Sequence, residues 1–451
     1  MEPRSMLDRF NLTPRFNLTP RFNLTRCPFV TATVVVTAFV LTHSTAPAQP
    51  GRYEQPPINY SEAEVHDRVA RLAEKIELGE VTLDYDQRFG YLKSVLDHLD
   101  VPVSSQTLVF SKTSLQLQRI SPHRPRSLYF NDDVYVGYCQ YGDVLEFAAT
   151  DAQQGATFYT LKQSEEGGPN FVRDRGGCLS CHASSRTQNI PGYLVRSVFT
   201  DAGGRPQLGS GTFTTDHTSD FKDRWGGWYV TGNHGSMRHM GNTISEGDEH
   251  SFDREPGANQ EDLTNYFSTK TYLAPHSDIV ALMVLEHQTQ MHNAIAAANY
   301  ETRQALYQSY QMNEMLGREK DYVSESAQRR IASSADRVLK YLLMCDEFQL
   351  TDRVSGSTAF ADEFVARGKR DARGRTLRDF DLQTRLFKYP CSYLIHSDAF
   401  AALPDAVRGT VLSRLMDTLE GRDDSPQYQH LTEPMRRGIL EILRDTLPEF
   451  R

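Results

Sequence analysis

The sequence is short of positive charge, of long apolar runs and of cysteine. Its 49 Lys and Arg residues are outnumbered by 58 Asp and Glu, which gives a formal net charge of −9. An acidic chain of this kind is not expected to bind nucleic acid or an anionic membrane surface. The longest apolar run is near the N-terminus, and no other segment approaches the roughly 20 apolar residues that a membrane-spanning helix needs. No Ser-His-Asp or nucleotide-loop signature stands out, so the few cysteines carry the most information.

The N-terminus has the three parts of an export signal. Arginines precede an apolar run over Phe29–Leu41, and a small-residue Ala-Pro-Ala sequence ending at Ala48 follows. The run is shorter than a membrane span. We therefore predict a signal peptide over residues 1–48 and a mature N-terminus at Gln49, with a retained membrane anchor as the alternative. The segment holds five Arg and two acidic residues, so its removal shifts the formal charge from −9 to −12.

Two of the six cysteines lie in a Cys-x-x-Cys-His motif, which consists of Cys178, Cys181 and His182. This spacing is that of a covalent attachment site for c-type haem. Two thiols three positions apart can reach the two vinyl groups of one porphyrin, and the adjacent imidazole can bind the iron as proximal ligand. A thioredoxin-like pair needs no histidine at this position, and a zinc site needs a second cysteine pair that the sequence lacks. We predict one haem c per chain.

The export signal and the motif support each other, because haem is attached to c-type apocytochromes outside the cytoplasmic membrane. We therefore predict a periplasmic protein. Three other cysteines follow the signal segment, an odd number for an oxidising compartment. If a disulfide forms, Cys345 and Cys391 are the expected pair, because Cys139 lies in a different, β-rich segment. The alternative is that all three are small buried side chains.

A sixth iron ligand is expected from residues 225–242. This segment contains both tryptophans of the chain, and its glycine turns allow the backbone to approach a porphyrin closely. The candidates, with the histidines slightly ahead of the methionine, are His234, His239 and Met240. If one of them binds, we expect a six-coordinate, low-spin haem, and its replacement by Ala should give a high-spin spectrum.

Further residues are candidates for the same cofactor. His287 and Met291 are one turn apart on the apolar stripe of a predicted helix and form a second possible ligand pair. The guanidinium groups of Arg196, Arg224 and Arg238 could bind the haem propionates, because their fork of donors suits carboxylates.

The pattern along the chain predicts an α+β fold with N-terminal helices, a central antiparallel β segment that carries the motif, and a helical C-terminal region. Apolar residues recur with helical period over residues 61–99, whereas short β-branched and aromatic segments separated by turns follow between 107 and 161. A hairpin is expected over residues 193–215, a long helix from Ser277 or Asp278 past Leu306, and two C-terminal helices. The expected domains after the signal peptide are 49–103, 104–270 and 271–451.

Several segments resemble a family of large exported bacterial proteins known as cytochrome c domain-containing proteins. The similar segments are 108–114, 128–137, 177–182, 225–232 and 389–395. The resemblance runs from about residue 100 to the C-terminus, and it implies haem attachment at Cys178 and Cys181 with axial ligation by His182. It implies no substrate. The arrangement of the motif between aromatic strands and a hairpin is also similar to PAS-like haem-c sensor domains.

Three functions compete at this point. The leading hypothesis is a periplasmic monohaem c-type cytochrome that passes single electrons between redox partner proteins. The enzyme alternative is a peroxidase-like haem oxidoreductase with an open distal site, which the size of the chain favours. A di-haem enzyme is excluded, because it would need a second Cys-x-x-Cys-His motif. The third hypothesis is a redox or gas sensor, although the chain has no recognisable output module.

Overall fold

The computed structural model describes residues 51–245 and 252–450. Residues Pro50–Arg451 form one compact unit, so the helical, β-rich and C-terminal regions expected after the signal peptide are parts of the same unit. The predicted signal peptide over 1–48 and its cleavage site lie outside the described residues. Within the described ranges, no helix is both long and apolar enough to cross a membrane.

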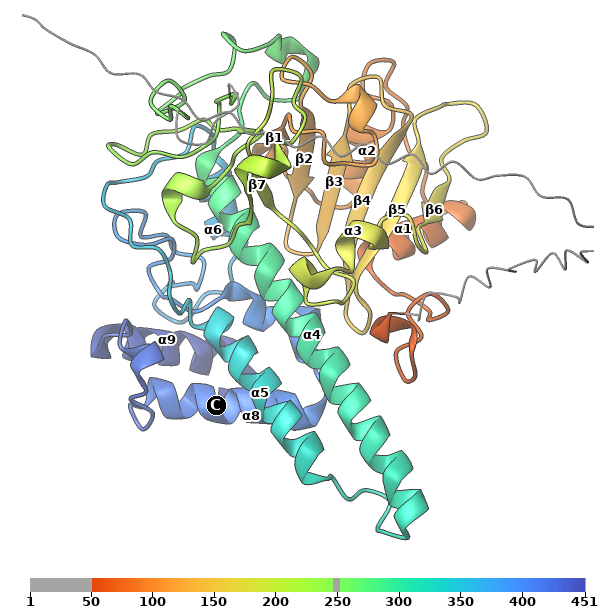
Figure 1. The fold of residues 1–451 in the computed structure, drawn as a ribbon, viewed down its shortest axis with the longest axis vertical. Coiled ribbons are helices and arrows are strands. Elements are labelled where there is room, and N and C mark those ends of the chain that lie inside the picture. Colours follow the sequence, from red (N-terminus) through yellow and green to blue (C-terminus); the bar gives the residue numbers. More distant parts are fainter. Residues whose placement is uncertain (1–50, 246–251, 451) are drawn as a thin grey trace, which may run out of the picture. The chain divides into compact units, whose positions relative to one another are not determined.

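A seven-stranded antiparallel sheet is the centre of the fold (Figure 1). It contains the strands predicted between 107 and 161, with one further short strand at each edge. In sheet order the strands are β6 (Phe171–Arg173), β5 (Gly155–Lys162), β4 (Val144–Asp151), β3 (Val134–Tyr138), β2 (Arg126–Phe130), β1 (Thr107–Val109) and β9 (Trp228–Tyr229). The predicted hairpin forms a separate two-stranded sheet of β7 (Arg196–Val198) and β8 (Thr212–Thr214).

Helices precede and follow the β segment, which confirms the predicted α+β class and the helical C-terminal region. In chain order they are α1 (Arg68–Glu77), α2 (Leu92–His98), α3 (Leu179–His182), α4 (Ile279–Leu316), α5 (Glu325–Leu342), α6 (Phe360–Ala366), α7 (Asp398–Ala401), α8 (Asp405–Leu419) and α9 (Glu433–Thr446). The N-terminal helices predicted from the helical period over 61–99 are α1 and α2. Gly79 follows α1 with a φ of 73°, a left-handed conformation that ends the helix although the apolar period continues.

The two faces of the sheet have different neighbours. On β4, Leu145 and Phe147 point to one face and are buried, whereas Glu146 and Ala148 point to the other and are half-buried. The first face packs against α1 and α2 in one hydrophobic cluster. Part of the second face packs against α4. The strip around Glu146 and Ala148 stays half-exposed, and this strip is where α3 lies.

The long helix α4 begins where the sequence predicts it. Asp278 caps its first turn by accepting hydrogen bonds from the backbone N–H groups of Val280 and Ala281, at 2.8 and 3.1 Å. Figure 1 shows α4 crossing in front of the sheet and continuing beside α5. Every residue from Ile279 to Tyr300 is buried. The predicted apolar stripe is therefore only part of a helix that is covered all round, and its polar side chains hydrogen-bond inside the protein.

Within the described residues, the three cysteines outside the motif, Cys139, Cys345 and Cys391, are buried free thiols, so the disulfide considered for Cys345 and Cys391 is not formed in the structure. Burial raises the pKa of Cys139 and Cys345 to about 12, which keeps both thiols protonated. The alternative of small buried side chains is therefore the correct one. We expect thiol labelling of the denatured protein to find three reactive cysteines besides Cys178 and Cys181. Labelling of only one would show that two are oxidised in the native protein.

Candidate haem attachment site

The motif occupies a single helical turn, which is stabilised by an aspartate before it and by a backbone hydrogen bond within it. Before it, the Asp174 carboxylate accepts hydrogen bonds from the backbone N–H groups of Gly176, Gly177 and Cys178, at 3.1, 3.2 and 2.9 Å. Within it, the His182 N–H donates to the Cys178 carbonyl at 3.0 Å. The two cysteines are thus three positions apart on one turn and lie on the same side of α3. Both thiols are free.

The His182 ring is oriented by a backbone carbonyl. Its Nδ1 donates to the Gly192 carbonyl at 3.0 Å. Nε2 has no hydrogen-bond partner in the described part of the chain. Burial lowers the pKa of His182, although the Gly192 carbonyl opposes that shift. The imidazole is therefore neutral with a free lone pair on Nε2, which is the state of a metal-binding histidine whose other nitrogen is held by a carbonyl.

Helix α4 fixes the position of that carbonyl. The Asn293 amide accepts a hydrogen bond from the Tyr193 N–H and donates one to the Tyr193 carbonyl, both at 2.8 Å. Gly192 passes close to the same amide, since a Cβ at this position would lie 2.5 Å from the Asn293 Oδ1. The chain therefore needs glycine here for the Gly192 carbonyl to face His182.

The thiols do not have the properties of a reactive dithiol. Burial, followed by the charge of Asp174, raises the pKa of Cys178 to about 12. Catalytic cysteines in thioredoxin-like pairs have lowered pKa values, because the thiolate is the nucleophile. Cys178 is half-buried and Cys181 is exposed. The environment thus argues against thiol–disulfide exchange and places the outer thiol at the surface of the protein.

Two arginines with unpaired nitrogens lie near the motif. Arg126 pairs with Glu146 at 2.7 Å across the half-exposed strip, and both charges act on Cys178 and His182. Arg196 donates to the Thr212 hydroxyl at 2.9 Å, and its charge interacts with Cys181. The Nε atom of each arginine is buried without a partner. A ligand with carboxylate groups beside the motif would supply the missing acceptors.

Of the three arginines proposed for propionate binding, Arg196 is the one that interacts with the motif within the described ranges. Arg224 is buried and pairs with Glu286 at 3.2 Å. Arg238 binds Glu255 on the surface, with its Nε atom 2.6 Å from the carboxylate. Arg126, which also lies near the motif, is not among the residues predicted from the sequence. The strand pairing could have predicted Arg126, because residues 126, 137 and 146 lie on one face of three paired strands. Glycine at position 137 leaves room for the Arg126 guanidinium, which a Cβ there would overlap.

The three candidates for the sixth ligand form hydrogen bonds with residues outside the motif. His234 uses both ring nitrogens, because Nδ1 donates to the Met237 carbonyl at 2.7 Å and Nε2 accepts the Asn259 N–H at 3.0 Å. His239 accepts the Gly241 N–H at Nδ1, and its buried Nε2 has no partner. The His239 ring packs against His234, Trp225 and Phe221. In the described ranges, no hydrogen bond or ring contact joins either histidine to residues 178–182.

Met240 packs against the face of β7 that carries the Ser197 side chain. Its sulfur accepts a hydrogen bond from the Ser197 hydroxyl at 3.6 Å. Ser197 and Arg196 are consecutive residues of β7, so their side chains point to opposite faces. Since Arg196 is the one whose charge interacts with Cys181, Met240 lies on the face directed away from the motif. Among the described residues, no hydrogen bond or ring contact links Met240 to the motif, and distal ligation by His234, His239 or Met240 stays a prediction.

The second ligand pair, His287 and Met291, is also engaged elsewhere. Both side chains are buried on α4. The His287 Nδ1 lies 3.2 Å from the His217 Nδ1, and its Nε2 lies 2.8 Å from the Ser392 hydroxyl. This is a core polar network, and in the described residues no hydrogen bond or ring contact connects it to the motif.

Neither the described side chains nor comparison with known proteins gives an independent indication of a cofactor. Among the described residues, no group of three or more His, Cys, Asp or Glu side chains is arranged to hold a metal ion. A haem needs no such group, because the porphyrin supplies four of the iron ligands. No protein-family model, no curated protein and no solved structure matches this chain.

Proposed function

We propose that the protein is an exported monohaem c-type cytochrome that transfers single electrons between periplasmic redox partners. The haem would be held by thioether bonds at Cys178 and Cys181, and His182 would bind the iron. The observation that carries this proposal is the state of His182, a neutral imidazole whose Nδ1 is fixed by the Gly192 carbonyl and whose Nε2 is free. When bound, the group would supply a one-electron redox couple.

The surroundings of the motif support the presence of a large, partly apolar group with two carboxylates. The half-exposed strip of the sheet offers apolar contacts at Leu128 and Ala148, both packed on the main hydrophobic cluster. Arg126 and Arg196 offer positive charge and unpaired donors. These residues would orient the group and hold its carboxylates, and the neutral His182 would keep its lone pair directed away from the Gly192 carbonyl.

Exposure of the motif favours electron transfer over substrate chemistry. Cys181 is exposed, and Cys178 and His182 are only half-buried. A group attached here would have an edge at the protein surface, where a partner protein could approach closely. An enzyme that activates a substrate at the iron requires instead a site from which water is excluded.

The second candidate function is that of a haem protein with an open sixth position, either a peroxidase-like oxidoreductase or a gas sensor. One specific observation favours it. His234 hydrogen-bonds through both ring nitrogens, and Met240 lies on the other face of β7 from Arg196. Neither side chain is therefore poised as a strong distal ligand.

Covalent attachment is the direct test of the proposal. We expect haem staining to survive denaturing electrophoresis when the full chain is produced in a host with haem-c maturation machinery. Replacement of both Cys178 and Cys181 by Ser should abolish the stain, because no thioether can then form. The buried Cys391→Ser variant is the matched control and should stain like the wild type. Equal staining of the double variant would disprove the proposal.

A further inference from the structure

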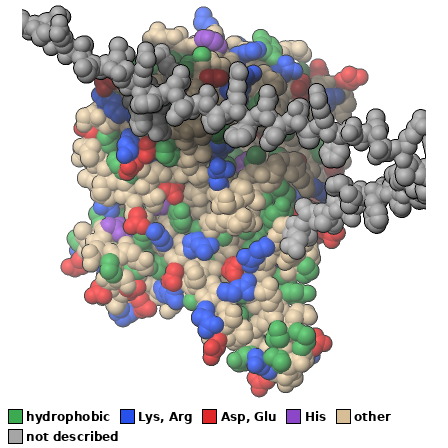
Figure 2. All heavy atoms as spheres, in the orientation of Figure 1, with side chains coloured by type: hydrophobic (Ala, Val, Ile, Leu, Met, Phe, Trp, Pro, Cys, Tyr) green, Lys and Arg blue, Asp and Glu red, His purple; other side chains and the backbone are tan. Residues whose placement is uncertain are grey.

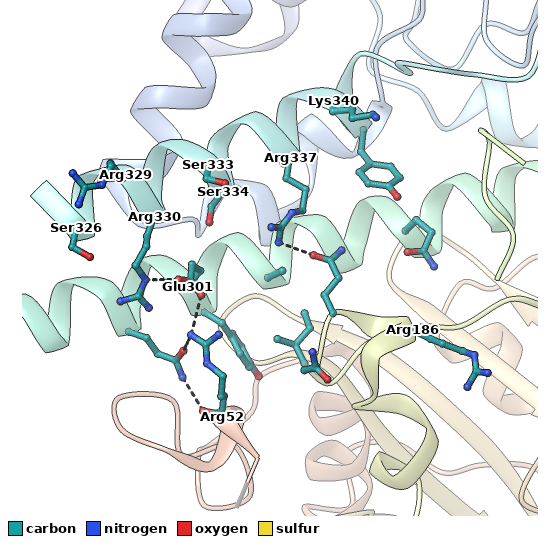
Figure 3. Close-up of a pocket in the computed structure, with 18 residues that line it drawn as sticks. Arg52, Arg186, Glu301, Ser326, Arg329, Arg330, Ser333, Ser334, Arg337 and Lys340 are labelled. Carbon is teal, nitrogen blue, oxygen red and sulfur yellow. Dashed lines mark hydrogen bonds and ion pairs between the residues drawn. The ribbon is translucent and has the colours of Figure 1, made fainter. Parts of the chain in front are cut away.

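A second candidate site lies beside residues 186–190, in the segment that follows the motif. A cavity of about 910 Å³ opens between α4, α5 and the 3₁₀ helix η4 (Ser185–Thr187). Figure 3 shows cationic side chains projecting from α5 toward Glu301 of α4 and toward η4. Neither motif cysteine lines the cavity, and nor does His182. It is therefore a separate site.

The lining of this cavity is strongly basic in a protein whose overall charge is negative. Glu301 is the single acidic residue among the residues that line it. The six cationic residues of the lining are Arg52, Arg186, Arg329, Arg330, Arg337 and Lys340. Figure 2 shows Lys and Arg side chains gathered along the α4–α5 pair. Such a concentration of one charge focuses the electrostatic field and attracts ligands of opposite sign.

Two of the six cations have no carboxylate partner among the described residues, since Arg329 pairs with Glu325 at 3.6 Å and Lys340 pairs with Asp346 at 2.6 Å. Arg52 and Arg330 share the one carboxylate of Glu301. Arg337 donates to the neutral Gln188 amide at 2.9 Å. Arg186 has no hydrogen bond or ion pair within the described part of the chain. Burial and, after it, the charge of Arg186 lower the pKa of nearby Arg196. The guanidinium groups of Arg186 and Arg337, which both line the cavity, therefore have no carboxylate partner in the described residues.

A buried donor also points to a ligand in this cavity. Gln290 lines it and is only 6% exposed. Its Oε1 accepts a hydrogen bond from the Asn293 amide at 3.4 Å, but its Nε2 is buried with no partner. A buried N–H group without an acceptor is costly, so a ligand acceptor at this point would stabilise the protein.

We infer that this cavity binds a small multivalent anion that carries phosphoryl or carboxylate groups. Arg186 and Arg337 would each bind one of its charged groups, because a guanidinium donates two parallel hydrogen bonds to either kind of group. Gln290 would donate to one of its inner oxygens. The volume is within the range of sites for ligands of drug size.

Calorimetric titration of the haem-loaded full chain tests this inference, with tripolyphosphate and citrate as the probes. We expect saturable binding of at least one of them, weakened by added salt. The tighter probe identifies the phosphoryl or carboxylate source, and equal affinities indicate recognition of the shared charge. The Arg186→Gln/Arg337→Gln variant should bind at least about 10-fold more weakly, since two charge-assisted contacts are lost. Both side chains are exposed, so the fold should be retained.

Two further variants complete the test. Gln290→Met keeps the side-chain volume and removes the buried donor, and it should weaken binding about five-fold or more. Arg71→Gln is the matched control. Arg71 is an exposed arginine without a side-chain partner in the described residues, and it lies on α1, which covers the opposite face of the sheet from α4. The inference is overturned if neither probe binds saturably, or if Arg71→Gln weakens binding as much as the cavity variants do.

Discussion

Replacement of Arg224 by methionine is expected to lower the free energy of unfolding by about 3–5 kcal/mol, the usual cost of breaking a buried ion pair. Arg224 is 2% exposed and its partner Glu286 is 0% exposed. The guanidinium also donates to the backbone carbonyls of His217 and Ser219, at 3.1 and 2.8 Å. Methionine preserves much of the volume, so the loss should come from an uncompensated carboxyl and two unsatisfied carbonyls rather than from a cavity.

The destabilisation should depend on pH in a defined direction. Burial raises the pKa of Glu286 to about 7 even though Arg224 opposes the shift, and removal of Arg224 should raise it further. A carboxyl whose pKa is higher in the folded state opposes folding above its unfolded pKa of about 4.3 and ceases to do so below it. Urea unfolding of Arg224→Met should therefore show a smaller loss at pH 5 than at pH 8.

Two other variants make this test specific. Glu286→Gln in the Arg224→Met background removes the ionisable group, so it should recover part of the stability and abolish the added pH dependence. Arg437→Met removes an exposed pair with Glu433 on α9 and should cost less than about 0.5 kcal/mol. A loss below about 1 kcal/mol in Arg224→Met, or a loss that is equal at both pH values, would contradict a structural role for the pair.

Arg224 also illustrates what the sequence could not predict. It was a candidate for propionate binding because a guanidinium suits carboxylates, and the structure gives it a carboxylate from Glu286 inside the core. The residue type predicted the chemistry but not the partner. The strands from 107 to 161 were predictable because turns separate alternating segments, and the start of α4 was predictable because Asp278 is a strong N-cap.

The basic cavity had no signal in the sequence either. Its cations come from three distant parts of the chain, namely the segment before α1, η4 and α5. On α5 alone, such residues read as the solvated face of an amphipathic helix. Only the packing of α5 beside α4 places them around the buried Gln290 amide, and this packing depends on contacts that no local pattern contains.

Carbon monoxide is expected to bind rapidly to the reduced, haem-loaded protein, because the side chains predicted as distal ligands are engaged elsewhere. His234 would have to give up two backbone hydrogen bonds, and Met240 would have to pass from one face of β7 to the other. His239 has a free Nε2, but its ring is enclosed by Trp225 and neighbouring rings. The spacing along the chain made these residues candidates. It could not show that Met240 packs on the Ser197 face of β7, or that the two histidines have partners elsewhere.

Optical spectra before and after addition of carbon monoxide provide the measurement. Replacement of His234, His239 or Met240 by Ala, one at a time, should leave the wild-type spectrum unchanged. His182→Ala is the positive control, since it removes the only ligand that the motif supplies. Its spectrum should change while the covalent stain persists through Cys178 and Cys181. If carbon monoxide binds slowly and one distal variant becomes high-spin, the segment 225–242 supplies the sixth ligand after all, which would contradict this prediction.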